Sequence, residues 1–200
     1  MTEETRLIHS GLAETPLART VGPPIQRGST VLLPNAAALY DDGAYLTYGR
    51  QGLAAQSALM AALAELEHAE AVTLYPSGLA ALTGAMLAVL KAGDEVLVVD
   101  AIYKPTRRFC DAVLVRYGVK VTYYAPGLGA AELMALCSAA TRLIVLESPG
   151  SLSFEMQDAP GIAAAARGRD ILTLIDNTWA AGLLFKPLDH GVDISVQALT

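Results

Sequence analysis

The chain has 200 residues, of which 53% are hydrophobic and 17% are charged, and its formal net charge is −6. This length and composition predict a well-buried globular domain and exclude a disordered chain. The acidic balance argues against a nucleic-acid partner. The apolar stretch at residues 78–90 is shorter than the roughly 18 residues of a membrane span, and the acidic N-terminus differs from a secretory signal. We therefore expect a cytoplasmic protein without a membrane partner.

Residues 1–55 differ from the rest of the chain, because they contain several prolines and no sustained hydrophobic period. The prolines are Pro16, Pro23, Pro24 and Pro34. Such a segment is typical of an extended N-terminal arm. Regular alternation of apolar patterns begins near residue 56, and we expect a single α/β domain over residues 56–200.

The apolar patterns after the arm predict alternating helices and strands. Helical spacing predicts helices over 54–70, 76–93, 104–118, 129–140 and 158–168. Glu65, Glu67 and His68 lie off the apolar stripe of the first of these helices. Short apolar runs predict strands over 71–75, 94–100, 119–125, 141–148, 170–176 and 193–199. The predicted fold class is therefore α/β, with a mainly parallel central sheet and helices on both faces.

Ligands of such sheets bind beyond the carboxyl ends of the strands, so the residues that follow each strand are the candidates for a site. The stretch YPSGLAAL, residues 75–82, places Ser77 and Gly78 at the start of an apolar helix. A helix N-terminus leaves amides unpaired and carries a partial positive charge, which suits a phosphate group. Serine is also a common N-cap, so Ser77 either caps the helix or helps to bind a phosphate.

The stretch LIDNTWAAG, residues 174–182, ends a wholly apolar strand with Asp176. A buried carboxylate must be paired or hydrogen-bonded, because leaving it bare is costly. An arginine of the protein would satisfy this need, and so would the protonated ring nitrogen of a ligand. The motif alone leaves a structural and a functional role open.

Three further candidates are aromatic or basic. Tyr48 and Arg50 lie in YLTYGRQG, where the arginine suits an oxyanion and the tyrosine offers an acid–base group and a stacking surface. The alternative is a surface arginine beside an interface tyrosine. Tyr103 follows a predicted strand, and its ring either stacks on a flat cofactor or packs in the core.

Other site classes find no support in the sequence. His9, His68 and His190 are scattered, without an acid or a nucleophile at motif spacing, so we expect no hydrolase triad. Cys110 and Cys137 have no metal-ligand spacing, and we expect two buried free thiols and no metal.

The motifs of this chain resemble, in order, those of the Cys/Met-metabolism enzymes that use pyridoxal 5′-phosphate (PLP). The motifs are TRLIHSG (5–11), YGRQG (48–52), YPSGLAA (75–81), YKPTRRFC (103–110), ESPGS (147–151), IDNTWAAG (175–182) and QALT (197–200). The resemblance covers essentially all 200 residues and implies the large domain of fold type I PLP-dependent transferases. It also implies that residues 1–55 serve in dimerisation.

Within the family, Trp179 and the ESPGS motif are most similar to the bacterial cystathionine β-lyase branch. Relatives that act at Cγ usually carry Phe after DNT and Asn at the position of Ser151. The family usually has Ser where this chain has Ala198, and Met where it has Leu79. Two of the family's usual cofactor contacts, at Ser151 and Ala198, therefore lack their usual side chains.

The resemblance assigns a role to each candidate residue. Asp176 would pair with the pyridinium nitrogen, Thr178 of the same motif would lie at the cofactor, and Tyr103 would stack on the ring and take a proton from the incoming amino group. Tyr48, the second catalytic candidate, and Arg50 would reach the phosphate bound by a neighbouring subunit. The other phosphate contacts would come from Ser77, Gly78, Leu79 and Thr200.

The resemblance further implies that the residue after Thr200 is the lysine that carries PLP. We expect this modified lysine to interrupt the sequence, and the chain to continue into a small C-terminal domain with the arginine for the substrate carboxylate. The expected oligomer is a homotetramer built from dimers that share active sites.

The expected reaction is α,β-elimination of L-cystathionine to homocysteine, pyruvate and ammonia, in methionine biosynthesis. Cystathionine γ-synthase, γ-lyase and cysteine desulfhydrase activities are alternatives within the family. A chain that truly ended at Thr200 would be a non-catalytic PLP-binding fragment. A nucleotide-binding α/β domain ranks last, because no Gly-rich fingerprint is present.

Overall fold

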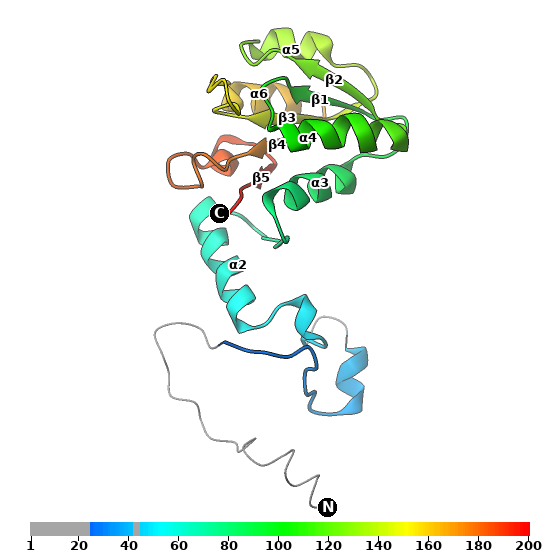
Figure 1. Cartoon of the computed structure of the whole chain (residues 1–200), viewed down its shortest axis with the longest axis vertical. Coiled ribbons are helices and arrows are strands. Elements are labelled where there is room, and N and C mark those ends of the chain that lie inside the picture. Colours follow the sequence, from blue (N-terminus) through cyan, green and yellow to red (C-terminus); the bar gives the residue numbers. More distant parts are fainter. Residues whose placement is uncertain (1–24, 42–44) are drawn as a thin grey trace, which may run out of the picture. The chain divides into compact units, whose positions relative to one another are not determined.

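A computed structural model of the chain describes residues 25–41 and 45–200. The part of the expected arm that holds Pro16, Pro23 and Pro24, the TRLIHSG motif and His9 lie outside the described residues. The chain divides after Ala58 into two compact units, and Figure 1 shows the course of the chain through both. The assignment of residues 1–55 to dimerisation stays a prediction.

The N-terminal unit is held by short 3₁₀ turns and side-chain caps. Its 3₁₀ turns are η1 (Ala36–Tyr40) and η2 (Gly49–Gln51). Asn35 Oδ1 accepts the Ala38 N–H at 3.0 Å, and Gln51 Oε1 accepts the Tyr48 N–H at 3.0 Å. An isolated antiparallel bridge joins Thr30 to Tyr48. These local bonds fix the loop that carries Tyr48 and Arg50.

The second unit is built on a five-stranded sheet in the order β2-β1-β3-β4-β5, and its four pairings are all parallel. The strands are β1 (Glu95–Val99), β2 (Lys120–Tyr124), β3 (Thr141–Glu147), β4 (Leu172–Asp176) and β5 (Ile194–Val196). The helices are α2 (Ala54–Glu67, which begins in the first unit), α3 (Gly78–Val89), α4 (Lys104–Phe109), α5 (Ala130–Leu136) and α6 (Ala159–Arg167).

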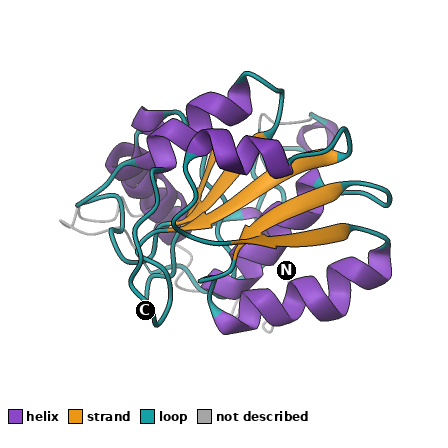
Figure 2. Ribbon diagram, turned by 90° about the horizontal axis from the view of Figure 1, so that it is seen from above, coloured by secondary structure: helices purple, strands orange, loops and turns teal. Residues whose placement is uncertain are grey.

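Helices cover both faces of the sheet, as Figure 2 shows. α3 packs with α4, and α5 packs with α6. All five residues of β1 are buried, and β3 is buried at every position except Arg142. Each fully buried Val, Leu or Ile contributes about 1.5–3 kcal/mol by leaving water. The predicted parallel sheet, buried on both faces, is confirmed.

The strand expected over 71–75 does not form. A cavity of about 490 Å³ lies between this segment and β5, and both line it. The apolar pattern of Val72 and Leu74 predicted a strand, but a strand needs a hydrogen-bonded neighbour, and among the described residues this segment has none.

Two predicted helices differ in detail. The helix over 104–118 changes its winding, from α4 to a π segment at Cys110–Leu114 and a 3₁₀ turn at Val115–Tyr117. The helix expected over 129–140 stops at Leu136, because Cys137 has extended backbone angles and Thr141 Oγ1 accepts the Ser138 N–H.

Cys110 is buried, whereas Cys137 is only half-buried, which corrects the expectation of two buried thiols. Within residues 25–41 and 45–200, no helix has the length and apolar character to cross a membrane.

Candidate active site

The strand order reverses between β1 and β3, because the chain passes from β1 to β2 on one side of it and then returns to β3 on the other side. Ligands of open α/β sheets bind at such a reversal, beyond the carboxyl ends of the strands. The two strand ends are joined here by a hydrogen bond, in which the Tyr103 N–H donates to Glu147 Oε2 at 2.7 Å. This bond fixes the start of α4 and the position of Tyr103.

Glu147, the last residue of β3, is a buried carboxylate that the sequence prediction did not single out. Ser151 Oγ donates to its Oε1 at 2.5 Å. Burial raises the pKa of Glu147, the nearby charge of Asp176 raises it further, and the hydrogen bonds from Ser151 and Tyr103 only partly offset this. Ser151 therefore supports Glu147 directly.

Asp176 ends the neighbouring strand β4 and stands in register with Glu147. Its Oδ1 accepts hydrogen bonds from Thr178 Oγ1 at 2.6 Å and from the Thr178 N–H at 3.1 Å. Burial raises the pKa of Asp176, and these two bonds lower it less than burial raises it. Both bonds go to Oδ1, and among the described residues Oδ2 has no donor, so it can accept one from a ligand. A protonated ring nitrogen is such a donor, and its positive charge would favour the ionised carboxylate.

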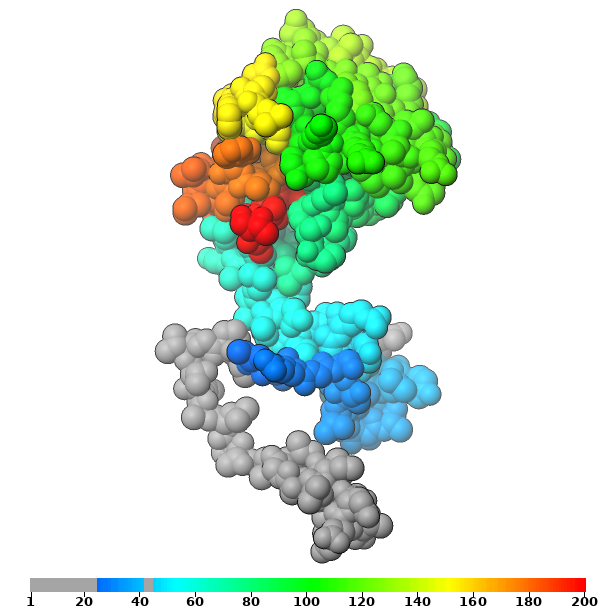
Figure 3. Space-filling model, in the orientation of Figure 1, coloured from blue at the N-terminus to red at the C-terminus, as the bar shows by residue number. Residues whose placement is uncertain are grey.

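Thr178 links Asp176 to the end of the chain. While its hydroxyl donates to Asp176, its Oγ1 accepts the Ala198 N–H at 3.0 Å. Ala198 in turn lies against Gly78, where an added Cβ would come within 2.7 Å of the Ala198 Cβ. Only a glycine permits this approach without a shift of one segment. Asp176, Ala198 and the start of α3 thus meet in one place, and Figure 3 shows the C-terminal segment at the surface beside α3.

The start of α3 presents the amides expected to bind a phosphate. Ser77 Oγ accepts the Ala80 N–H at 3.1 Å, so Ser77 is an N-cap, as one of the two interpretations held. The first hydrogen bond of the helix runs from the Ala81 N–H to the Ser77 carbonyl, at 3.0 Å. The amides of Gly78 and Leu79 precede that bond and donate to no acceptor among the described residues, so they can bind an anion. This cradle fits a phosphate group.

The remaining predicted residues fall in two places. Tyr103 is 47% exposed, so its ring lies outside the core and is accessible for stacking. Thr200 lines the same cavity as Ser77 and Gly78. Tyr48 and Arg50 lie in the N-terminal unit, both exposed, with the guanidinium 5.2 Å from the centroid of the tyrosine ring. The structure thus brings together the candidates of the second unit, and the roles of all of them stay predictions.

The geometry defines a class of protein: a parallel α/β domain with a phosphate cradle and a buried carboxylate, as in fold type I PLP-dependent enzymes. A family model for Cys/Met-metabolism PLP-dependent enzymes matches residues 4–200, and the chain belongs to this family. PLP is the cofactor of the family.

Individual relatives agree with this assignment. A putative cystathionine β-lyase of Rhizobium johnstonii is 46% identical over 98% of this chain and 49% of its own length. A cystathionine γ-lyase from Lactobacillus plantarum, solved with L-serine, is 34% identical with a TM-score of 0.82, over 98% of this chain and 49% of its own.

A putative O-acetylhomoserine (thiol)-lyase from Campylobacter jejuni, solved with a pyridoxyl-lysine phosphate, is 25% identical with a TM-score of 0.83, over 90% of this chain and 45% of its own. The chain spans about half the length of each of these three relatives.

Proposed function

We propose that this chain forms the PLP-binding part of a carbon–sulfur β-lyase that splits L-cystathionine into homocysteine, pyruvate and ammonia. The observation that carries the proposal is Asp176, a buried carboxylate with a raised pKa and with one oxygen that receives no hydrogen bond from the described residues. The choice of β-elimination rests on the 46% identity to the Rhizobium relative and on the motifs around Trp179 and Ser151.

PLP, when bound, supplies an electron sink for negative charge that develops at the substrate Cα. The residues of this chain would hold it at three points. Asp176 would pair with the ring nitrogen and keep it protonated, while Thr178 fixes the direction of the carboxylate. The amides of Gly78 and Leu79 at the start of α3, with Ser77 and Thr200, would hold the phosphate.

Tyr103 would cover the ring and accept a proton from the substrate amino group. Its backbone is fixed by Glu147, so the phenol is carried on a rigid helix start. A preorganised aromatic group of this kind orients a flat ligand at little entropic cost. The lysine that bonds PLP is expected directly after Thr200, and the substrate-carboxylate arginine beyond it.

Tyr48 and Arg50 would bind the phosphate held by a second copy of the chain, so that each site is shared across a dimer and two dimers form a tetramer. Arg50→Ala should then weaken PLP retention. Hybrid dimers test the sharing directly. Mixing the Arg50→Ala and Asp176→Asn variants creates one site that holds both defects and one intact site. Activity recovered on mixing supports the shared site, and no recovery contradicts it.

The reaction is tested with protein expressed from the complete reading frame. Purified protein should show visible absorbance of bound PLP. After reduction with borohydride, peptide mass spectrometry should find the pyridoxyl group on the residue that follows Thr200. Incubation with L-cystathionine should release pyruvate. A colourless protein that PLP does not alter would overturn the proposal.

γ-Elimination is the second candidate, because the Lactobacillus plantarum structure at 34% identity is a cystathionine γ-lyase. The two reactions are separated by their oxo-acid products. Pyruvate from cystathionine identifies cleavage at Cβ, and 2-oxobutyrate identifies cleavage at Cγ and would replace the proposed reaction.

A further inference from the structure

Glu67, the last residue of α2, is 5% exposed, although the helical pattern placed it off the apolar stripe. Its Oε1 accepts hydrogen bonds from Gln197 Nε2 at 3.0 Å and from Asn177 Nδ2 at 3.4 Å, and Asn177 Nδ2 also donates to the Phe185 carbonyl at 3.0 Å. These partners lie 110 and 130 residues further along the chain. A single carboxylate oxygen therefore joins the segment after β4 to the segment after β5.

These two segments carry the candidate cofactor residues. Asn177 stands between Asp176 and Thr178, and its N–H donates to the Val196 carbonyl at 2.7 Å, which extends the pairing of β4 with β5. Successive side chains of an extended chain point to opposite sides. Holding the Asn177 side chain toward Glu67 therefore turns the side chain of Asp176, the residue before it, to the other side, where Thr178 Oγ1 donates to it.

The loop after β4 is shaped to cover this carboxylate. Gly182 has φ of +65°, and a Cβ at this position would lie 2.5 Å from Glu67 Oε1. Lys186 Nζ donates to the Leu66 carbonyl, which brings a positive charge to the end of α2. The same loop thus wraps around the end of the helix and encloses the Glu67 side chain.

The hydrogen bonding of Glu67 is incomplete. Neither Glu67 Oε2 nor Asn177 Oδ1 has a partner among residues 25–41 and 45–200, although both atoms are buried. Buried polar atoms without partners cost stability, and an apolar side chain of similar size is often neutral or better at such a position. Among the described residues, the link between the two segments is therefore the role that the structure gives this glutamate.

We propose that Glu67 is a positioning residue for the cofactor site, which holds the segments carrying Asp176 and Thr200 at a fixed spacing through Asn177 and Gln197. The inference rests on the proposed function, because it assigns PLP as the ligand that those segments hold. It adds a residue on α2 that touches neither the ring nor the phosphate.

The test compares Glu67→Met with Glu67→Gln and with Glu65→Met, in protein expressed from the complete reading frame. Glu65 lies on the same helix and is exposed, so Glu65→Met is the matched control. Methionine removes both hydrogen bonds at similar volume, and glutamine keeps an oxygen that accepts them. We expect Glu67→Met to bind PLP about ten-fold more weakly, as supporting residues of a site typically do when changed. Glu67→Gln and Glu65→Met should bind it as the parent does.

Two further measurements separate positioning from stability. The pH dependence of the visible absorbance of bound PLP should shift in Glu67→Met, because the contact between Asp176 and the ring is displaced. Without PLP, hydrogen exchange of the Ala198 amide should be faster in Glu67→Met than in Glu65→Met, since its bond to Thr178 loosens. If Glu67→Met does not fold, Gln197→Leu removes one of the two bonds and should show smaller changes of the same sign.

Equal PLP affinity, equal absorbance titration and equal amide exchange in Glu67→Met and Glu65→Met would overturn the inference, while PLP binding by the parent would leave the proposed function standing. If the parent itself binds no PLP, the proposed function fails. The positioning of a PLP site by Glu67 then fails with it, and the amide exchange shows only whether Glu67 joins the two segments.

Discussion

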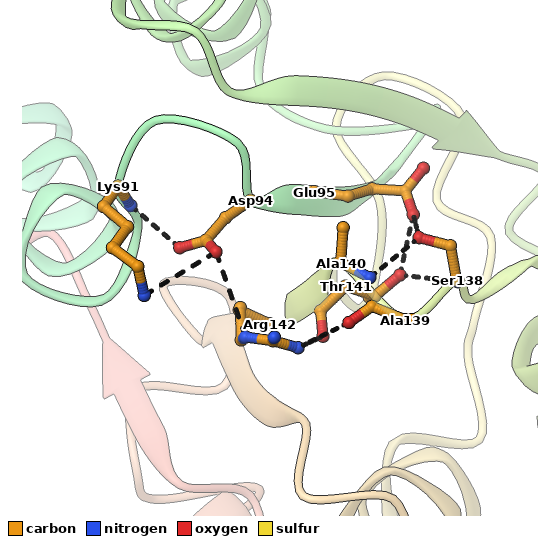
Figure 4. Close-up of polar contacts among 8 residues, drawn as sticks. All are labelled: Lys91, Asp94, Glu95, Ser138, Ala139, Ala140, Thr141 and Arg142. Carbon is orange, nitrogen blue, oxygen red and sulfur yellow. Dashed lines mark hydrogen bonds and ion pairs between the residues drawn. The ribbon is translucent and has the colours of Figure 1, made fainter.

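Buried carboxylates lie at both ends of the strands of the central sheet, and their surroundings differ. At the amino ends, Glu95 opens β1 and receives hydrogen bonds from four side chains. The donors are Lys120 at 2.6 Å, Thr122 at 2.9 Å, Ser138 at 2.5 Å and Thr141 at 2.8 Å. Burial raises the pKa of Glu95, but these bonds outweigh it and lower the pKa to about 2. Figure 4 shows the contacts from Ser138 and Thr141, with Asp94 beside them between Lys91 and Arg142.

At the carboxyl ends, Glu147 and Asp176 stand in register on adjacent strands, and neither receives a bond from a Lys or Arg side chain among the described residues. Burial raises the pKa of both. Because the protein itself supplies all of its donors, Glu95 is a structural residue that links β1 to β2 and β3. An incomplete set leaves Asp176 available to a ligand, which is typical of functional sites.

The largest effect is expected from Asp176→Asn, at the carboxyl ends of the strands, and it should be an effect on activity rather than on stability. The amide cannot hold a positive charge on a ring nitrogen, so we expect activity to fall on the order of 10²–10³-fold, as for other preorganised electrostatic groups. The free energy of unfolding without PLP should stay unchanged or rise, because a buried charge is removed. Initial rates and urea unfolding measure the two effects. Loss of stability with full activity would remove the distinction between the two ends.

Glu95→Gln should show the reverse pattern. The amide removes the negative charge that pairs with Lys120 and turns one of the two accepting oxygens into a donor that faces hydroxyl groups, so we expect a cost of about 3 kcal/mol. Urea unfolding should report this loss, whereas the affinity for PLP measured on the folded protein should stay near that of the parent. Lys120→Met is the control, and it should cost less because the Lys120 side chain is 70% exposed.

The pH dependence of the free energy of unfolding tests the same hydrogen bonds of Glu95. The folded pKa of Glu95, about 2, lies below its ordinary value of 4.5. Its contribution is therefore fully present above pH 4.5 and is lost as the pH falls toward 2. The parent should lose stability over that range, and Glu95→Gln should lose less. Equal slopes in the two proteins would contradict the assigned pKa.

The sequence predicted this sheet because the sheet depends on local patterns. Continuous apolar runs identify buried parallel strands, and in a parallel sheet each strand end is a candidate position for a site. This logic selected Tyr103 and Asp176 as candidates, and their roles stay predictions. It also gave Ser77 two roles, and the structure shows the capping role through the bond to Ala80. The role of Ser77 toward a phosphate stays a prediction.

What the sequence did not predict depends on contacts between distant segments. Val72 and Leu74 have a strand pattern, but a strand needs a hydrogen-bonded neighbour, and the described residues give this segment none. Glu67 lay off the apolar stripe, and partners more than 100 residues away bury it. Glu147 ends an apolar strand just as Asp176 does, and this shared signal could have identified it.

A smaller effect is expected from Gly78→Ala, because the added methyl group would push the start of α3 away from the segment that holds Ala198. The new Cβ would meet the Ala198 Cβ at 2.7 Å, so α3 or the C-terminal segment must shift. Overpacking of this kind costs about 1–3 kcal/mol, partly offset by the better helix propensity of alanine. We expect the free energy of unfolding to fall by about 1 kcal/mol and the affinity for PLP to fall about ten-fold. Gly84→Ala on the same helix controls for helix propensity; its Cβ would lie 2.6 Å from the Tyr75 ring, so that side chain must move. Unchanged affinity in Gly78→Ala would place the phosphate elsewhere.

The smallest effect is expected from Glu147→Gln. This substitution should change the pH dependence of stability in the direction opposite to that of Glu95→Gln. Because the folded pKa of Glu147 is raised, its ionisation reduces stability as the pH rises from the ordinary value through the folded one. Glutamine keeps an acceptor for the Tyr103 N–H and has no charge. Stability at neutral pH should therefore change by less than about 1 kcal/mol, and the slope above the ordinary pKa should flatten. Urea unfolding over that pH range measures both.

Glu147→Ala, which removes the acceptor, should cost about 2 kcal/mol and weaken PLP binding by releasing Tyr103. If Glu147→Gln were as unstable as Glu95→Gln, Glu147 would be a structural carboxylate like Glu95, and the carboxylates at the two ends of the sheet would not differ in role.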